Sequence, residues 1–283
     1  MTALADNLTS SVYDPVMTES SSQLATSQAT KNEWDQLIAK DFSSAAKGYH
    51  KHNIVQQHAS AILCEHLQVQ GTLLDIGAGP GTDFSHCLKL DNVMSIDIAA
   101  GMLKKLKDNF PNYHGIQGDA QSLPLLNKSV NAIYSNLALQ WCHNFEQAVM
   151  EAARVLKPSG SVDISVVVEN SLPELSSLGF KVNRFHPFDT LVSCFKEKDW
   201  QLREAKIVPV TVYFDDLKSL LYSIKGVGAS VLMNRSEPSS LVLRGRQDWQ
   251  ALNEKAQSLR QEKGIPLTYY IAIIRAKRQC HRV

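Results

Sequence analysis

The sequence has no long apolar run, no excess of charge and few cysteines. Its 283 residues carry a formal net charge of +1, with 44% hydrophobic and 20% charged residues. This composition is ordinary for a soluble globular protein, and no apolar run approaches the length needed to cross a bilayer. The first residues lack the apolar stretch of a signal peptide and the arginines of a transit peptide. We therefore expect a cytoplasmic protein.

Cysteine and histidine follow no metal-binding or redox pattern. The five cysteines are scattered and no two have Cys-x-x-Cys spacing. An odd, scattered set is typical of free thiols in a reducing compartment. The nine histidines show no metal-ligand spacing apart from His50 and His52. We expect no structural metal ion.

Charge is distributed unevenly along the chain. Residues 1–170 contain 11 Lys/Arg and 17 Asp/Glu, whereas residues 171–283 contain 18 Lys/Arg and 11 Asp/Glu. The basic half would suit an acidic partner, although surface charge also fluctuates without meaning. Nucleic acid is not the expected partner, because the basic residues are dispersed and the isoelectric point is 7.7.

Strand-like and helix-like segments alternate after a polar start. Residues 1–32 are rich in Ser and Thr and poor in large apolar residues, so we expect a flexible tail. Strands are predicted over 72–76, 93–98, 113–117, 130–135 and 161–168. Helices are predicted over 53–67, 82–90, 102–110 and 145–156. This alternation predicts an α/β, Rossmann-like domain over residues 33–283, with a mostly parallel sheet and helices on both faces.

The regular alternation of strands and helices ends near residue 171. We predict a helix over 188–195, strands over 206–214 and 265–276, and a basic, mostly helical insertion between these last two strands. The sheet would then have seven strands. Residues 70–170 would form the cofactor-binding half, and residues 171–264 the elaboration that binds substrate.

A glycine-rich turn follows the first strand. Residues 73–81 are Leu-Leu-Asp-Ile-Gly-Ala-Gly-Pro-Gly, and glycines let the backbone approach a ligand and adopt positive φ. Asp97 lies 20 residues beyond Gly77 at the end of the second strand, where a carboxylate can accept both ribose hydroxyls. Asp119 follows the third strand and is placed to accept from an adenine amino group. Asp75 can receive backbone N–H groups or a ligand's ammonium group.

The spacing of these residues resembles the S-adenosylmethionine site of class I methyltransferases. A dinucleotide site would usually have glycine where this chain has Thr82. The run from Ala152 to Gly160, Ala-Ala-Arg-Val-Leu-Lys-Pro-Ser-Gly, strengthens the resemblance. The cofactor-binding residues that it implies are Tyr49, Asp75, Gly77, Ala78, Gly79, Gly81, Asp97, Ile98, Met102, Asp119, Ala120, Asn136 and Leu137.

Further segments resemble the malonyl-acyl carrier protein O-methyltransferases of biotin synthesis. They cover roughly residues 40–276 and include 42–49 (FSSAAKGY), 135–142 (SNLALQWC), 171–175 (SLPEL), 183–185 (NRF), 224–229 (IKGVGA) and 266–270 (PLTYY). Two departures are Val130-Asn131, where the family usually has Phe-Asp, and His50, where it usually has Asp. The resemblance implies methylation of the free malonyl carboxylate on an acyl carrier protein, which primes the pimeloyl part of biotin.

This chemistry needs positioning more than proton transfer. A carboxylate with a reference pKa of about 4 is ionised at neutral pH, so it needs no general base. A guanidinium fork would recognise it, which makes Arg184 the first candidate and Lys225 the second. A surface salt bridge is the alternative role of Arg184. The resemblance places Tyr49 over cofactor and substrate, and Gln140 follows the fourth strand at the ligand-binding edge.

The carrier is acidic, so a basic landing surface is expected in the insertion. Its candidate residues are Lys218, Lys225, Arg235, Arg244 and Arg246. The alternatives are a methyltransferase acting on another small carboxylate or a quinone precursor, a dinucleotide-dependent oxidoreductase, and a non-catalytic relative. The sequence leaves open the choice between malonyl-carrier and malonyl-CoA, and also the oligomeric state, for which a monomer is one expectation.

Overall fold

The computed structural model describes residues 33–227, 229 and 245–280. The chain divides into the units Met1–Gln36 and Leu37–Val283, and the fold below is that of the second unit. The predicted tail over residues 1–32 lies outside the described residues, as do Arg235 and Arg244 of the predicted landing surface.

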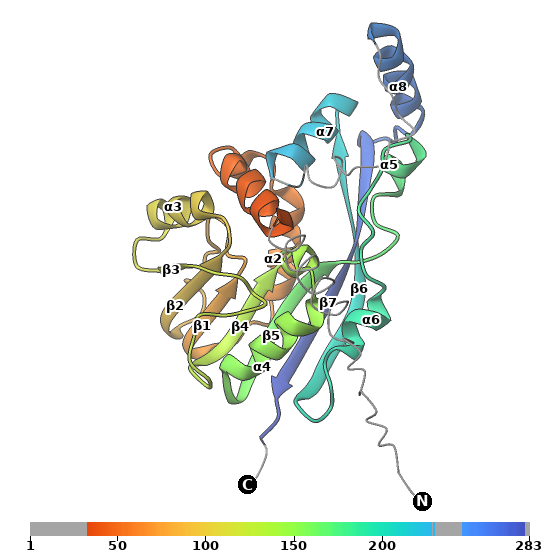
Figure 1. Ribbon diagram of the computed structural model, residues 1–283. Coiled ribbons are helices and arrows are strands. Elements are labelled where there is room, and N and C mark those ends of the chain that lie inside the picture. Colours follow the sequence, from red (N-terminus) through yellow and green to blue (C-terminus); the bar gives the residue numbers. More distant parts are fainter. Residues whose placement is uncertain (1–32, 228, 230–244, 281–283) are drawn as a thin grey trace, which may run out of the picture. The chain divides into compact units, whose positions relative to one another are not determined.

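A seven-stranded sheet forms the centre of this unit (Figure 1), with the strand order β3-β2-β1-β4-β5-β7-β6. The first five strands pair in parallel, and β7 runs antiparallel to both β5 and β6. The strands are β1 Gln70–Ile76, β2 Lys89–Asp97, β3 His114–Gln117, β4 Val130–Asn136, β5 Leu156–Val167, β6 Trp200–Phe214 and β7 Ile265–Arg278.

Helices connect the strands, beginning with a helical segment over residues 37–45. The others are η1 Tyr49–Lys51, α2 Ile54–Cys64, α3 Ala100–Asn109, η2 Leu139–Trp141, α4 Phe145–Val155, α5 Pro173–Ser177, α6 Phe188–Ser193, α7 Leu217–Gly226 and α8 Arg246–Ser258. The predicted helical insertion is therefore present, because α7 and α8 lie between β6 and β7 in the chain.

Two apolar cores cover the two faces of the sheet. Neighbouring strand residues point to opposite faces, so Leu73 packs in the core that contains α2, and Leu74 packs in the core that contains α4. A central strand is therefore buried on both faces, as β5 is over Val162–Val167, where Asp163 and Ser165 are the buried polar residues. The α/β, Rossmann-like fold with a mostly parallel sheet is confirmed.

One predicted element is wrong. Residues 82–88 form turns instead of the first part of a helix over 82–90, and β2 already begins at Lys89. The Asp83 carboxylate accepts the N–H of Ser85 at 2.9 Å, a local bond that competes with helical hydrogen bonding. The phenol oxygen of Tyr113 accepts the N–H of Phe84 at 3.2 Å and holds the turn against the strand edge.

The order of the strands places a crevice at one edge of the sheet. The chain builds outward from β1 to β2 and β3 on one side, then continues through β4 on the other side. Ligands of such sheets bind outside the carboxyl ends of the strands at this switch point. Here that point lies between the ends of β1 and β4.

Neither a disulfide nor a metal-binding cluster is found in the described part of the chain. Its helices are also too short or too polar for any of them to span a bilayer.

Candidate functional site

The glycine turn after β1 depends on backbone conformations that favour glycine. Gly77, Gly79 and Gly81 have φ of 69°, 54° and 93°. A Cβ atom on Gly77 would lie 2.1 Å from the Cβ of Ala138, whereas one on Gly79 would meet no atom within 4 Å. The turn is fixed to β2 because the Gly77 N–H donates to the carbonyl of Ile96 at 2.8 Å. The open space beside Gly79 leaves room for a ligand near the backbone.

Asp97 links this turn to the end of β2. Its carboxylate accepts the Gly79 N–H and the Ala99 N–H, each at 2.8 Å. Burial raises the pKa of Asp97 to about 6, and these two hydrogen bonds oppose the shift. A carboxylate has about four acceptor positions, so Asp97 keeps acceptor capacity for the hydroxyls of a ribose.

Asp75 and Tyr49 bring polar groups into a buried place beside the turn. Asp75 is only 1% exposed, and its Oδ2 has no hydrogen-bond partner among the described residues. Burial, and then the charge of Asp97, raise the pKa of Asp75 well above its usual range. Burial followed by the charges of Asp97 and Asp75 likewise raises the pKa of Tyr49. Tyr49 therefore remains a protonated donor at physiological pH.

A cavity of about 410 Å³ joins these groups. It is lined by Tyr49, Asn53, Gln56, Gln57, Ser60, Ala61, Cys64, Asp75, Gly77, Ala78, Pro80, Gly81, Thr82, Asp83, His86 and Asn136. Six predicted cofactor residues thus line one cavity. The contribution of α2 and its N-cap Asn53 was not predicted, although positions 53, 57, 60 and 64 have helical spacing and small or polar side chains. That polar stripe was the available signal.

Two predicted residues at the carboxyl end of β4 have local structural bonds. The amide of Asn136 donates to the carbonyl of Gln56 at 2.9 Å and accepts from the Ser165 hydroxyl at 2.7 Å. Asn136 therefore lines the cavity while joining α2 to the sheet. Leu137 has φ 49°, and its N–H donates to the Ser165 carbonyl at 3.0 Å.

Gln140 lies one turn further, in η2. Its Nε2 donates to the carbonyl of Leu137 at 2.6 Å. Its Oε1 is buried without a hydrogen-bond partner in the described part of the chain. The neighbouring Trp141 ring packs edge-on against Phe42, with ring centroids 5.4 Å apart, as expected for a packing residue.

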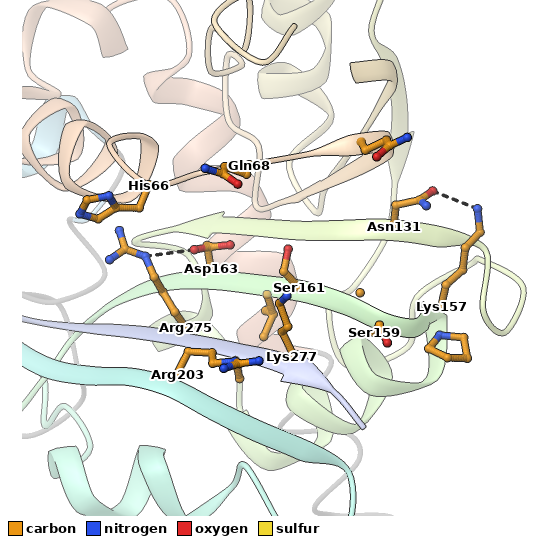
Figure 2. A pocket seen from close by; sticks show the side chains of 15 residues that line it. His66, Gln68, Asn131, Lys157, Ser159, Ser161, Asp163, Arg203, Arg275 and Lys277 are labelled. Atoms are coloured by element: carbon orange, nitrogen blue, oxygen red, sulfur yellow. Dashed lines mark hydrogen bonds and ion pairs between the residues drawn. The ribbon is translucent and has the colours of Figure 1, made fainter. Parts of the chain in front are cut away.

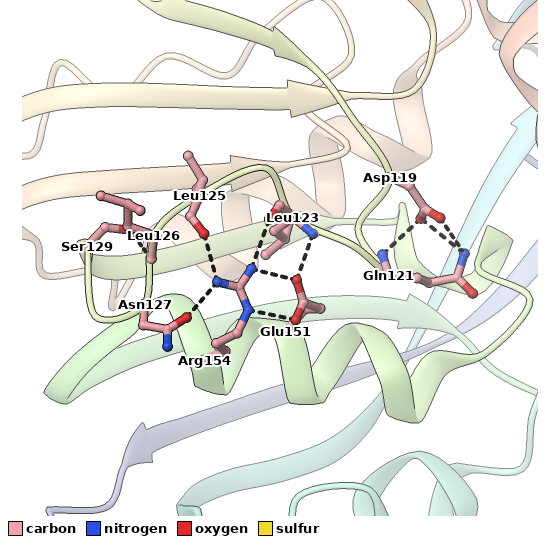
Figure 3. A network of polar contacts seen from close by, with 9 residues as sticks. All are labelled: Asp119, Gln121, Leu123, Leu125, Leu126, Asn127, Ser129, Glu151 and Arg154. Atoms are coloured by element: carbon pink, nitrogen blue, oxygen red, sulfur yellow. Dashed lines mark hydrogen bonds and ion pairs between the residues drawn. The ribbon is translucent and has the colours of Figure 1, made fainter.

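Asp119 follows β3 and is oriented by Gln121 (Figure 3). Its Oδ1 accepts the Gln121 backbone N–H at 2.8 Å and the Gln121 side-chain amide at 3.0 Å. Arg154 holds the loop beyond: its guanidinium donates to the carbonyls of Leu123 and Leu125 and pairs with Glu151 at 2.7 Å. The Ala-Ala-Arg-Val-Leu segment therefore stabilises the loop that carries Asp119.

The other predicted cofactor residues lie near neighbouring strand ends and outside the lining of this cavity. Ile98 directly follows β2, and its carbonyl accepts from the Gln117 amide at 3.1 Å. Met102 is buried in a small apolar cluster against which Tyr49 packs. Ala120 is partly buried against the core that contains α4.

The predicted substrate residues Arg184 and Lys225 are exposed, and neither lines the 410 Å³ cavity. Arg184 lies between Val182 and Phe185, which both pack into the core that contains α2. Lys225 lies in the last turn of α7. A Cβ on the next residue, Gly226, would come within 2.2 Å of the His52 ring, so α7 ends against the segment that carries Tyr49.

The charge of the cavity distinguishes between two ligand classes. Two lining carboxylates, Asp75 and Asp83, face a single histidine, His86, and the lining contains neither lysine nor arginine. The orphaned Asp75 oxygen would be satisfied by a cationic or hydrogen-bond-donating group. These residues fit S-adenosylmethionine, which carries an ammonium and a sulfonium group, better than the anionic pyrophosphate of a dinucleotide.

Comparisons with known proteins identify the domain and the fold. Residues 74–164 match the family model described as a methyltransferase domain. An S-adenosylmethionine-dependent methyltransferase from Thermotoga maritima shares the fold with a TM-score of 0.50. It is 17% identical to this chain, and the match covers 85% of this chain and 99% of that one. Fold and site together define a class I methyltransferase, and S-adenosylmethionine is its methyl donor.

Two curated relatives show to which family of methyltransferases the chain belongs. The malonyl-acyl carrier protein O-methyltransferase of Enterobacter lignolyticus is 31% identical over 83% of this chain and 94% of its own length. The biotin biosynthesis bifunctional protein BioHC of Cellvibrio japonicus is 31% identical over 83% of this chain and 48% of its own length. The chain belongs to the malonyl-acyl carrier protein O-methyltransferase family.

Proposed function

We propose that this protein transfers the methyl group of S-adenosylmethionine to the free carboxylate of a malonyl group on an acyl carrier protein. The product is the malonyl methyl ester that primes pimeloyl synthesis for biotin. The observation that carries this proposal is the cationic-ligand cavity at the switch point, formed by Asp75, Tyr49 and the glycine turn, in a chain similar to these enzymes over 83% of its length.

S-adenosylmethionine, when bound, supplies a methyl group activated by its sulfonium. Asp75 would hold the cationic methionine end, and Asp97 would accept from the ribose hydroxyls. Asp119, already oriented by Gln121, would accept from the adenine amino group. Asp75 is the penultimate residue of β1, Asp97 ends β2 and Asp119 follows β3, and these three strands are adjacent in the sheet.

The substrate carboxylate needs alignment and an anhydrous surrounding. It is already ionised at neutral pH, so no side chain has to remove a proton from it. The raised pKa of Tyr49 keeps its phenol protonated. A protonated phenol, close enough to Asp97 and Asp75 for their charges to act on it, can donate a hydrogen bond to an incoming carboxylate and orient one of its oxygens toward the methyl group.

Recognition of the malonyl carboxylate falls to the cations around this edge of the sheet. Lys225 is the better placed, because Gly226 beside it lies against His52, three residues after Tyr49. Arg184 belongs to a loop fixed near the end of β5 by a 3.1 Å hydrogen bond from the Glu169 N–H to the His186 carbonyl. The loop is thus tied to the same edge, where Arg184 would reach the substrate after a movement of its side chain.

The acidic carrier would dock on α7 and the start of α8. Lys218, Tyr222 and Lys225 have helical spacing on α7, and all three are exposed. Arg246, the first residue of α8, is also exposed. Positive charge on this elaboration would speed the encounter with an acidic protein.

The decisive assay combines the protein with S-adenosylmethionine and malonyl-acyl carrier protein and measures the carrier by mass spectrometry. We expect a gain of one methyl group. Acetyl-carrier, which has no free carboxylate, is the matched control and should remain unchanged. An unmodified malonyl-carrier alongside methylation of a free small acid would contradict the proposal.

The two carboxylate-binding candidates can be separated by kinetics. Arg184→Ala and Lys225→Ala should each leave S-adenosylmethionine affinity within about twofold, because neither lines the cofactor cavity. Substitution of the residue that binds the malonyl carboxylate should lower kcat/KM for malonyl-carrier about 10- to 100-fold, because a charged hydrogen bond is lost. Equal losses of cofactor affinity and turnover would remove that residue from a substrate role.

A further inference from the structure

A second cavity, of about 520 Å³, lies at the opposite edge of the sheet (Figure 2). It opens beside the amino ends of β1, β4 and β5, between the segment that follows α2 and the exposed ends of β6 and β7. Asn131 lines this cavity and Asn136 lines the cofactor cavity on the same strand, so the two are separated by about 16 Å at 3.3 Å per residue. Neither cofactor nor substrate in the proposed reaction accounts for it.

Four cationic side chains and one carboxylate line the second cavity. The cations are Lys157, Arg203, Arg275 and Lys277, and the carboxylate is Asp163. The single lining carboxylate cannot neutralise the positive charge of the four cations. How much of this positive charge remains depends on the groups behind the cavity wall.

Arg275 is neutralised by its neighbours. It is 9% exposed, donates to Asp163 Oδ1 at 3.1 Å and pairs with Glu204. It also donates to the carbonyl of Ile62 at 2.7 Å, which caps the end of α2. Lys206 completes a balanced set of two cations and two carboxylates by pairing with Glu204 at 2.6 Å.

Three cations remain without an opposing carboxylate on the lining. Lys157 Nζ donates to the neutral Asn131 side chain at 2.9 Å. Arg203 and Lys277 form no ion pair or side-chain hydrogen bond with another described residue, and both are exposed. Lys277 on β7 pairs with Ser161 on β5, and Arg203 lies on β6, the strand on the other side of β7 (Figure 2). Among the residues that the structure describes, the cavity therefore presents about three uncompensated positive charges.

The backbone directs Arg203 into this position. β6 and β7 shift register between Leu202 and Glu204, so Arg203 is the extra residue of a β-bulge. Bulges re-aim a side chain that a regular strand would present elsewhere. On β7, Arg275 and Lys277 are two residues apart and share one face of the sheet. The bulge thus brings a third cation to a face that already carries two.

We propose that this cavity, named here the amino-edge cavity, binds a small soluble anion that carries a diphosphate group. Guanidinium and ammonium groups around a concave site favour phosphate oxygens, and Arg203 can donate to them in bidentate fashion. The hydroxyls of Ser159 and Ser161 add neutral donors. The cavity is larger than one phosphate requires, its volume is in the range of small-molecule sites, and its lining has no Phe, Tyr or Trp that would favour an apolar ligand.

The test is calorimetric titration of the full chain with sodium pyrophosphate at constant ionic strength. We expect one pyrophosphate per chain, the same affinity with and without saturating S-adenosylmethionine, and weaker binding of orthophosphate. Loss of pyrophosphate binding in the presence of S-adenosylmethionine would overturn the proposal, because the anion would then occupy the cofactor cavity. Orthophosphate binding as tight as that of pyrophosphate would overturn the diphosphate class.

A double variant assigns the binding to this cavity. Arg203→Ala/Lys277→Ala should lower pyrophosphate affinity at least about tenfold, since each cation donates charged hydrogen bonds. Both side chains are exposed, so the melting temperature should not change. Lys104→Ala/Lys198→Ala removes two exposed cations outside the cavity and should retain full affinity. Unchanged affinity in the first variant, or equal loss in both, would contradict the proposal.

Discussion

Asp75 is a buried carboxylate whose second oxygen has no hydrogen-bond partner among the described residues. Such a group costs stability in the empty protein. A bound cation would supply the missing partner, so Asp75 lowers the stability of the empty protein and raises its affinity for a cationic ligand. Burial raises the pKa of Asp97 beside it to about 6, and burial, followed by the charge of Asp97, raises the pKa of Asp75.

These raised pKa values predict a pH-dependent cofactor affinity. A raised pKa means that the empty site takes up protons as the pH falls through about 6, whereas a cationic ligand requires the ionised carboxylates. S-adenosylmethionine affinity should therefore decrease from pH 8 to pH 5, by about tenfold per pH unit below each pKa. Calorimetric titrations at several pH values measure it. Asp97→Asn should remove the part of the slope near pH 6, and an affinity that does not vary from pH 5 to pH 8 would contradict this account.

The glycine turn permits a matched comparison of two substitutions. Gly77→Ala adds a Cβ 2.1 Å from that of Ala138 at φ 69°, and should cost about 2–4 kcal/mol and displace the turn. Gly79→Ala meets open space at φ 54°, so only about 1 kcal/mol of backbone strain is expected. Denaturant unfolding measures both. A larger loss at Gly79 would show that the turn is not packed as described.

At the scale of elements, the loop that carries Asp119 depends on Arg154. This side chain joins Glu151 to the carbonyls of Leu123 and Leu125. Arg154→Ala should cost about 2 kcal/mol, because several charge-assisted bonds are lost from a side chain that is 31% exposed. Arg154→Lys should recover little, since an ammonium cannot replace the guanidinium fork.

Hydrogen exchange would locate this effect. Amides of residues 121–129 should exchange faster in Arg154→Ala, whereas those of β7 should keep their protection. Uniformly faster exchange in both regions would indicate global destabilisation instead of a loosened loop.

Local pattern predicted the elements well where one periodicity dominated. The spacing of α2 gave an element close to the one observed, whereas the apolar run predicted only part of β5, which begins five residues earlier, at Leu156. The helix predicted over 82–90 is wrong because the apolar residues there have helical spacing although the segment forms turns. The Asp83 carboxylate accepts the nearby Ser85 N–H, and the Tyr113 hydroxyl, far along the chain, accepts the Phe84 N–H. Such a long-range contact is not encoded in local spacing. The cavity-lining role of α2 was missed for the same reason, since it depends on which face meets the glycine turn.

At the scale of the molecule, the acidic half of the chain contains the cofactor cavity, and the basic half contains the proposed docking surface for the carrier. The cofactor cavity has acidic side chains, whereas α7 and α8 carry the exposed cations proposed to meet the carrier. Turnover of malonyl-carrier should therefore fall several-fold between about 50 and 300 mM salt, where screening shortens the range of surface charge.

Charge reversal tests where that dependence originates. Lys218→Glu/Arg246→Glu should raise KM for malonyl-carrier about tenfold and flatten its salt dependence, with little effect on cofactor affinity. Lys104→Glu, an exposed site on α3, is the control and should behave as the unsubstituted protein. An unchanged KM in the double variant would place the docking surface elsewhere.

The two outer strands of the sheet have a consequence for assembly. β3 is only four residues long, whereas β6 has 15 residues and pairs only with β7 among the described strands. A long unpaired edge could recruit a strand from another molecule. Pro209 has no N–H to offer there, the bulge at Arg203 breaks the regular register, and Lys206 adds charge. These features of β6 oppose the addition of a strand from another molecule, while the carboxyl ends of the strands remain accessible to ligands.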